Sequence, residues 1–264
     1  MPIALRLTVS TLLGFALAAP APQAQAVEPP LTLRHAFNFT ADANSSSGAI
    51  GSLHGGASVA QGVLQLRGAE AWAGYAALIP TAEDGGASWW SVSLWARQTT
   101  PHPGAMATMV GQGPAAGYLP EFTLGIAAWN NPAVVQAQNQ SGWAGAASAT
   151  QPGSAWHHYA TTMRENAVFL YVDGVLAASG AAGHDYSTPY LHGSMRLGRQ
   201  VAGFGEQFTG DLDDVRIYAG RFDDATVAAQ FAAGPSPVPE PGALGLWALG
   251  LAGLGALRRL RQRR

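Results

Sequence analysis

Cysteine and lysine are both absent from the sequence, and only 11% of its 264 residues are charged. Without cysteine the chain has no disulfides, no thiolate metal ligands, no thiol nucleophile and no cysteine to carry a lipid. Hydrophobic residues make up 48% of the sequence, which is enough for a core that is stable without disulfides. The 33 glycines indicate many tight turns rather than long helices.

The few charges are unevenly distributed. Five of the arginines lie at positions 258–264, whereas residues 27–238 carry eight arginines and 15 acidic residues, a net charge of −7. An acidic segment without a basic stripe argues against nucleic acid as a partner.

The N-terminus has the three-part pattern of a secretory signal peptide. Arg6 precedes an apolar stretch over 7–19, and Ala24-Gln25-Ala26 supplies the small residues of a cleavage site. The alternative is an uncleaved membrane anchor, which is disfavoured because the apolar run is too short to span a bilayer. The pattern therefore predicts a signal peptide over residues 1–26 and export through the Sec route.

The C-terminus has a different three-part pattern. Pro239-Glu240-Pro241 precedes an uncharged stretch over 242–257, and arginines dominate 258–264. At about 1.5 Å per residue the uncharged stretch spans about 24 Å, slightly less than the hydrocarbon core of a membrane. Trailing arginines favour the cytoplasmic side. The pattern predicts a short transmembrane helix with the body of the protein outside the cell.

This order of features closely resembles the PEP-CTERM sorting signal, which we assign to residues 235–264. The resemblance implies recognition and cleavage by an exosortase, in a Gram-negative bacterium that makes exopolysaccharide. It also implies a location in the cell envelope or outside the cell, with a membrane anchor that is transient or retained. The alternative is a plain tail anchor, which does not need a Pro-Glu-Pro motif.

Residues 27–234 have the pattern of a single all-β domain. In 91–97 the apolar residues Val92, Leu94 and Ala96 alternate with residues of the opposite face, as in a strand with one side buried. Short strands joined by glycine-rich segments favour a sandwich of two sheets. We expect strands over 34–39, 63–66, 91–97, 122–127, 156–163, 167–173, 175–177, 195–198 and 214–218.

Two local signals are more specific. Asp173-Gly174 lies between two strands and predicts a two-residue hairpin turn, because both residue types tolerate positive φ. A short helix is expected after Asp223, which can cap it, and before Gly234, which can stop it. Its predicted apolar stripe consists of Val227, Ala228 and Phe231.

Four sequence blocks occur in a characteristic order: WSVSLWAR at 90–97, WHHYA at 156–160, LYVDGV at 170–175 and GDLDDVRIY at 210–218. Together they closely resemble the LamG-like, concanavalin A-like lectin/glucanase superfamily over nearly all of residues 31–233. The resemblance implies a jelly-roll sandwich of two antiparallel sheets, often with calcium at its edge. It implies no single function, since relatives bind glycans or proteins or hydrolyse polysaccharides.

The resemblance also implies where calcium would bind. Relatives often use an aspartate and an asparagine after the first strand, together with the aspartate that corresponds to Asp213. In the first loop serine and alanine occupy these positions, so Asp42 would have to supply the carboxylate. Calcium needs six to eight oxygen ligands. The alternative is that the aspartates of 211–214 pair with arginines such as Arg199 or Arg216.

No catalytic residue is predicted. A glycosidase needs two carboxyl groups across a sugar cleft, and the Glu-x-Asp-x-x-Glu pattern of laminarinase-like relatives is absent. Asp211 and Asp213 share one strand face but belong to the structural block of the family. His157 and His158 point to opposite faces of a strand, so we expect one to be packed and one to lie at the surface.

Aromatic residues between strands are the best candidates for ligand binding. Trp129, Asn130 and Trp143 combine flat rings with an amide, a mixture that stacks on and hydrogen-bonds sugars, and Tyr118 lies in a similar glycine-flanked segment. The alternative is that these rings pack at the edge of the sandwich.

These patterns predict an exported, non-enzymatic LamG-like domain that binds carbohydrate, such as exopolysaccharide or biofilm matrix, or mediates adhesion. The expected partners are an exosortase, a glycan and, through the tail, the membrane. The first alternative is a structural surface protein without a small ligand. The second is a glucanase-like polysaccharide hydrolase.

Overall fold

The structure is a computed structural model. It describes residues 30–68, 70–79, 89–100, 106–114, 121–127, 133–139, 142–148, 153–164, 167–180, 193–201 and 207–235. The predicted signal peptide and nearly all of the predicted sorting tail lie outside these ranges, so the proposed domain boundaries stay predictions.

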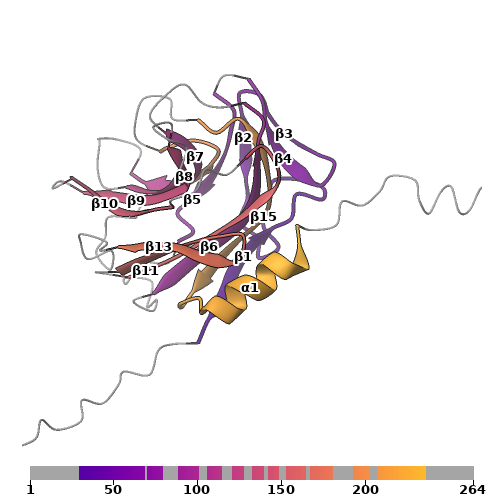
Figure 1. The fold of residues 1–264 in the computed structure, drawn as a ribbon. Helices are drawn as coiled ribbons and strands as arrows, with labels where there is room; N and C mark the ends of the chain where they lie inside the picture. Colours follow the sequence, from indigo (N-terminus) through magenta and orange to yellow (C-terminus); the bar gives the residue numbers. More distant parts are fainter. Residues whose placement is uncertain are drawn as a thin grey trace, which may run out of the picture.

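The described residues form two sheets packed face to face, with every pairing between named strands antiparallel (Figure 1). The eight-stranded sheet runs β13 (Val175–Gly180), β12 (Ala167–Val172), β11 (His157–Arg164), β6 (Trp90–Gln98), β15 (Gly210–Ala219), β4 (Val63–Leu66) and β3 (Ala57–Ala60), with β1 (Thr32–Phe37) also paired to β15. The seven-stranded sheet runs β10 (Gly142–Ala147), β9 (Ala133–Asn139), β8 (Glu121–Ala127), β7 (Met106–Gly113), β14 (Ser194–Leu197), β5 (Trp72–Ala76) and β2 (Ser52–His54). This arrangement confirms the predicted jelly-roll sandwich.

The main core lies between the two sheets. Val92, Leu94 and Ala96 of β6 point into it, as their alternation predicts, and so do Leu124 of β8 and Leu197 of β14. Each of the nine predicted strands corresponds to a strand of the structure, with shifted ends. Burial of both inner faces is therefore the main source of stability.

The β12–β13 hairpin confirms the predicted turn. Asp173 has φ +50° and Gly174 has φ +81°, as a type I′ turn requires. Gly174 also lies directly against Phe231, because a Cβ atom placed on it would be 2.9 Å from the Phe231 Cβ. The turn thus fixes where the C-terminal helix packs.

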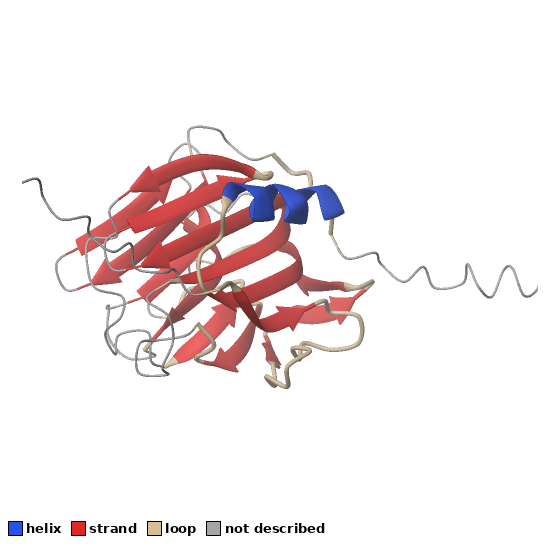
Figure 2. Ribbon diagram, turned by 90° about the horizontal axis from the view of Figure 1, so that it is seen from below, coloured by secondary structure: helices blue, strands red, loops and turns tan. Residues whose placement is uncertain are grey.

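The helix α1 (Asp224–Ala233) lies across the outer face of the eight-stranded sheet (Figure 2). Asp223 caps it by accepting a hydrogen bond from the Thr226 amide at 2.6 Å, and Gly234 ends it with φ +75°, as predicted. Val227 is buried, but Ala228 is exposed and Phe231 is 39% exposed, so the predicted stripe is confirmed only at Val227. A second apolar cluster lies beneath the helix and consists of Ala160, Tyr171, Tyr218, Phe222 and Val227.

The contact between Gly174 and Phe231 generates a stability prediction. We expect Gly174→Ala to lower the free energy of unfolding by more than the matched variant Gly68→Ala. Gly68 has a similar φ of +76° but open space around its missing Cβ, so that variant carries only the backbone strain, about 1 kcal/mol. Urea denaturation of both variants measures the difference. Equal losses would show that Phe231 does not restrict this position.

Candidate functional site

The aromatic residues proposed for ligand binding are only partly placed. Trp129, Asn130 and Tyr118 lie outside the described residues. Trp143 does not lie in a loop, as its neighbours suggested, but within β10, where it pairs with Gln138 of β9. The predicted position between strands was wrong, because Gly142 and Trp143 already belong to β10.

The two aspartates proposed for calcium are both engaged by protein groups. Asp42 is exposed and accepts bonds from the amide and the side chain of Asn44, at 2.8 and 2.9 Å. Asp213 is buried, and its Oδ1 accepts a bond from the Asp214 amide at 2.7 Å. Within the described ranges no three His, Asp or Glu side chains are grouped to hold a metal ion. Six to eight oxygen ligands would have to come largely from elsewhere, so calcium stays a prediction.

The histidine pair diverges, as expected of neighbours on a strand. The His158 ring is buried and packs beside Trp95 and Phe231 under α1. His157 points the other way and is not fully at the surface, because its Nδ1 lies 2.8 Å from the Asp173 carboxylate. Burial lowers the pKa of His158 to about 4. His158 is thus a neutral packing residue rather than a base.

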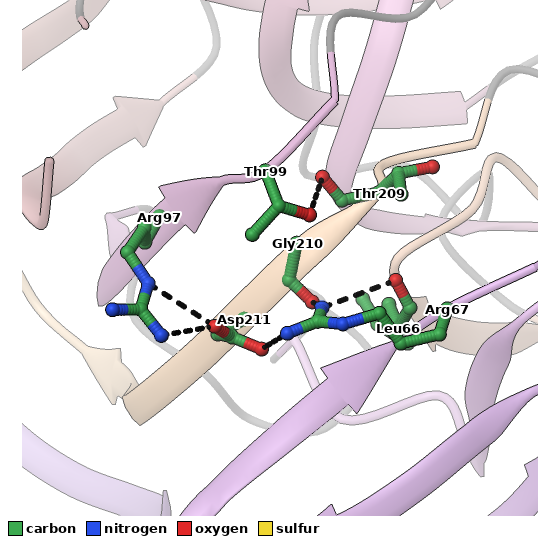
Figure 3. A network of polar contacts seen from close by, with 7 residues as sticks. All are labelled: Leu66, Arg67, Arg97, Thr99, Thr209, Gly210 and Asp211. Carbon is green, nitrogen blue, oxygen red and sulfur yellow. Dashed lines mark hydrogen bonds and ion pairs between the residues drawn. The ribbon is translucent and has the colours of Figure 1, made fainter. Parts of the chain in front are cut away.

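Asp211 is the centre of an ionic network on the eight-stranded sheet (Figure 3). Its side chain is inaccessible to solvent and accepts hydrogen bonds from Arg67, next to β4, and from Arg97 on β6, at 2.6 Å from the Arg97 Nη2. Arg67 also donates to the carbonyl of Gly210. The Arg97 guanidinium lies 5.0 Å from the centre of the Trp156 ring. The network links three adjacent strands and gives Asp211 a structural role.

A second acidic residue of this block, Asp214, is also paired with an arginine. Asp214 contacts Arg216 at 2.7 Å, which confirms the alternative in which these aspartates form ion pairs. Arg199 pairs instead with Glu70, again at 2.7 Å, so its expected pairing with the aspartates of 211–214 was wrong.

A stack of three side chains crosses the outer face of the seven-stranded sheet. Trp72 of β5 lies between His54 of β2 and Arg196 of β14. The His54 and Trp72 rings are 3.7 Å apart and nearly parallel, at 8°, and the Arg196 Cζ lies 4.3 Å from the Trp72 ring centre. All three point away from the core, since their strand neighbours Ala73 and Leu197 point into it. We call His54, Trp72 and Arg196 the stacked triad.

The backbone around the stacked triad is adapted to it. A Cβ atom on Gly74 would be 2.4 Å from the Trp72 ring, so only glycine leaves room for the indole at this position. Ser52, opposite Gly74, contacts the His54 Nε2 through its hydroxyl at 3.0 Å. These contacts hold the rings in one geometry before any ligand arrives.

Charged groups border the stacked triad. The exposed Glu70 carboxylate pairs with Arg199, and hydrogen bonding to Arg199, with a smaller effect of Arg196, lowers the pKa of Glu70. The Glu70 amide in turn donates to Gln207 at 2.7 Å. The surface therefore combines rings, hydrogen-bonding groups and two arginines against one carboxylate. Sequence reasoning missed it because Arg196 lies more than 100 residues from His54 and Trp72 in the sequence, and only the strand register brings the three together.

Comparison with known proteins agrees with this fold. Residues 71–228 match the sequence profile described as the concanavalin A-like lectin/glucanases superfamily, and they make up more than half of the chain. The chain therefore belongs to the concanavalin A-like lectin/glucanase superfamily. At its C-terminus, residues 237–262 match the PEP-CTERM protein-sorting motif, which includes Pro239, Glu240 and Pro241. No curated protein sequence matches the chain significantly.

Solved structures share the fold at low sequence identity. Domain 4 of AbnA, an extracellular GH43 arabinanase of Geobacillus stearothermophilus solved with arabinotriose, is 22% identical with a TM-score of 0.63, over 75% of this chain and 98% of that one. The receptor-binding domain of botulinum neurotoxin D is 12% identical with a TM-score of 0.59, over 76% of this chain and 52% of that one. The binding domain of botulinum neurotoxin DC, in complex with SialylT, is 14% identical with a TM-score of 0.58, over 76% and 51%. The chain thus spans about half the length of the toxin domains.

The network around Asp211 generates a second stability prediction. We expect the double variant Arg67→Gln/Arg97→Gln to lose about 3–5 kcal/mol of stability, because it leaves a buried carboxylate without a cation. Adding Asp211→Asn removes the unpaired charge and restores part of the loss. Urea denaturation of the double and triple variants measures both effects. A triple variant no more stable than the double would argue against the buried charge as the cause.

The buried His158 generates a pH prediction. Its pKa is about 4 in the fold, against about 6.5 in the unfolded chain. Between these values the unfolded state binds the extra proton, so stability falls as pH falls, by about 3 kcal/mol at pH 4. Unfolding curves of the native protein and of His158→Gln, taken across this range, isolate the effect. A pH dependence that His158→Gln leaves unchanged would contradict it.

Proposed function

We propose that this protein is exported, sorted by an exosortase to the cell envelope or surface, and binds carbohydrate there without hydrolysing it. The observation that carries the binding proposal is the stacked triad of His54, Trp72 and Arg196. Sugars are bound in proteins by flat rings that cover their apolar faces and by polar groups that receive their hydroxyls. The stacked triad offers both in a fixed arrangement.

The geometry of the stacked triad sets how a sugar would bind. Trp72 is covered on its faces by His54 and Arg196, so its accessible part is the outer edge of the indole. His54 is exposed and ends the stack, which leaves its outer ring face for a sugar ring. Because the rings are already held, binding costs little side-chain entropy.

The charges favour an acidic glycan. Among the described residues around the stacked triad, Arg196 and Arg199 outnumber Glu70, whereas residues 27–238 as a whole carry a net charge of −7. Carboxylate groups of a uronic acid polymer match arginine donors. A secreted exopolysaccharide with such groups is the ligand that we propose. Trp129, Asn130, Trp143 and Tyr118 stay predicted as additional contacts.

The termini support export. The PEP-CTERM motif indicates processing by an exosortase and a location at the cell envelope or surface. We propose that residues 1–26 direct Sec export and that 242–257 hold the chain in the membrane until the tail is cut. No helix within the described ranges is long and apolar enough to cross a membrane, and residues 242–257 lie outside them.

The non-enzymatic proposal is supported by two observations. Asp211 shares its strand with Asp213, but both of its oxygens are engaged by Arg67 and Arg97, so it is not available as one half of a glycosidase pair. Two of the solved structures with the same fold are described as binding domains of toxins.

The binding proposal is tested with polysaccharides and matched tryptophan variants. We expect the protein to be retained by an immobilised uronate polymer more strongly than by a neutral glucan. Trp72→Ala weakens retention at least about tenfold, which corresponds to about 1.4 kcal/mol. Trp156→Ala is the control, since Trp156 also lies beside an arginine but on the other sheet. The measurement is affinity electrophoresis at several ligand concentrations.

Other outcomes of this experiment select the alternatives. Equal weakening by Trp72→Ala and Trp156→Ala would exclude the stacked triad as the site. No retention on any polysaccharide would favour a structural surface protein, and release of reducing sugar would favour a hydrolase.

A further inference from the structure

Two exposed apolar side chains lie where the folded domain ends. Leu176 and Phe231 are 42% and 39% exposed. Leu176 lies in the β12–β13 hairpin, two residues after Gly174, and Gly174 lies against Phe231 of α1. Leu176 pairs with Tyr171, whose hydroxyl bonds to Asp224 of α1 at 2.9 Å, so it belongs to the face that the helix covers. We call Leu176 and Phe231 the apolar corner.

The chain leaves the domain at this corner. Phe231 lies in the last turn of α1, which ends at Gly234, and the match to the sorting motif begins at residue 237. Residues 235–241 separate Gly234 from the uncharged stretch of 242–257. Seven residues span at most about 25 Å even when fully extended. The apolar corner is therefore held close to the point where the tail would enter a membrane.

We infer that the apolar corner rests on the lipid surface of the membrane while the uncut tail anchors the protein. The inference rests on the proposed insertion of residues 242–257. Two exposed apolar side chains bind a membrane only weakly by themselves. A short tether changes this, because it converts binding into an intramolecular step at a high effective concentration.

The charges near the apolar corner favour a lipid surface without a requirement for anionic lipid. The last turn of α1 carries no basic residue, and the neighbouring Asp173 is paired with His157. Contact is then driven by burial of apolar surface, so vesicles with and without anionic lipid are expected to behave alike.

This contact would orient the domain. The helix α1 lies on the outer side of the eight-stranded sheet (Figure 1), and the apolar corner lies on the same side. The stacked triad lies on the outer side of the seven-stranded sheet. With the apolar corner on the membrane, the proposed sugar-binding surface faces away from it, towards the extracellular matrix.

The absence of cysteine allows a direct test. Leu176→Cys in the full chain, labelled with an environment-sensitive fluorophore, reports the apolar corner. Leu53→Cys is the control, because Leu53 is also 42% exposed but lies on β2 of the other sheet. Each labelled protein is reconstituted into phosphatidylcholine vesicles, with or without phosphatidylglycerol, that contain a lipid-borne quencher.

We expect the label at 176 to shift its emission to the blue and lose most of its intensity to the quencher. The label at 53 changes little. Equal responses at 176 and 53 would overturn the proposal. Flotation with the vesicles reports tail insertion separately, and failure to float would overturn the insertion and this inference together. Neither result affects the glycan experiment.

Discussion

The buried carboxylate of Asp211 constrains how the central strands of the eight-stranded sheet pair. It is tolerated because arginines from both neighbouring strands reach it, and they do so only when β4, β15 and β6 have one relative register. Beyond Asp213 a bulge turns β15 away from β4, and the second half of the strand pairs with β1 instead. The ionic network therefore lies where the sheet changes partners, and the burial of the core on either side depends on that register.

The two outer faces of the sandwich differ in what lies on them. The eight-stranded sheet has a helix over it, and a second apolar cluster is sealed beneath that helix. The seven-stranded sheet presents rings and arginines instead, supported by Gly74, whose missing side chain makes room for the Trp72 indole. One face thus connects the domain to its sorting tail, and the other provides a ligand surface. These two roles follow from the proposals for the two faces, taken together.

Much of the fold could be predicted from local patterns, but the candidate site could not. Strands whose core-facing apolar residues alternate along the sequence, such as β6 and β12, could be predicted, and the Asp173-Gly174 turn is specified by two residues. β7 was missed because its sequence, MATMVGQG, shows no such alternation. β10 consists mainly of glycine and alanine, which carry a weak strand signal. His54, Trp72 and Arg196 meet only through the pairing of β2, β5 and β14, which a single sequence does not reveal.

The pairing of β1 with β15 has a consequence for how the protein is made. Phe37 lies opposite Val215, so the first strand meets its sheet neighbour only after nearly the whole domain has been synthesised. Closing such a long loop is slow compared with forming local hairpins. A chain threaded through a translocation channel has to remain unfolded during passage, and this topology itself delays folding. On the proposed Sec route, the last strand to emerge would complete the sheet on the far side of the membrane.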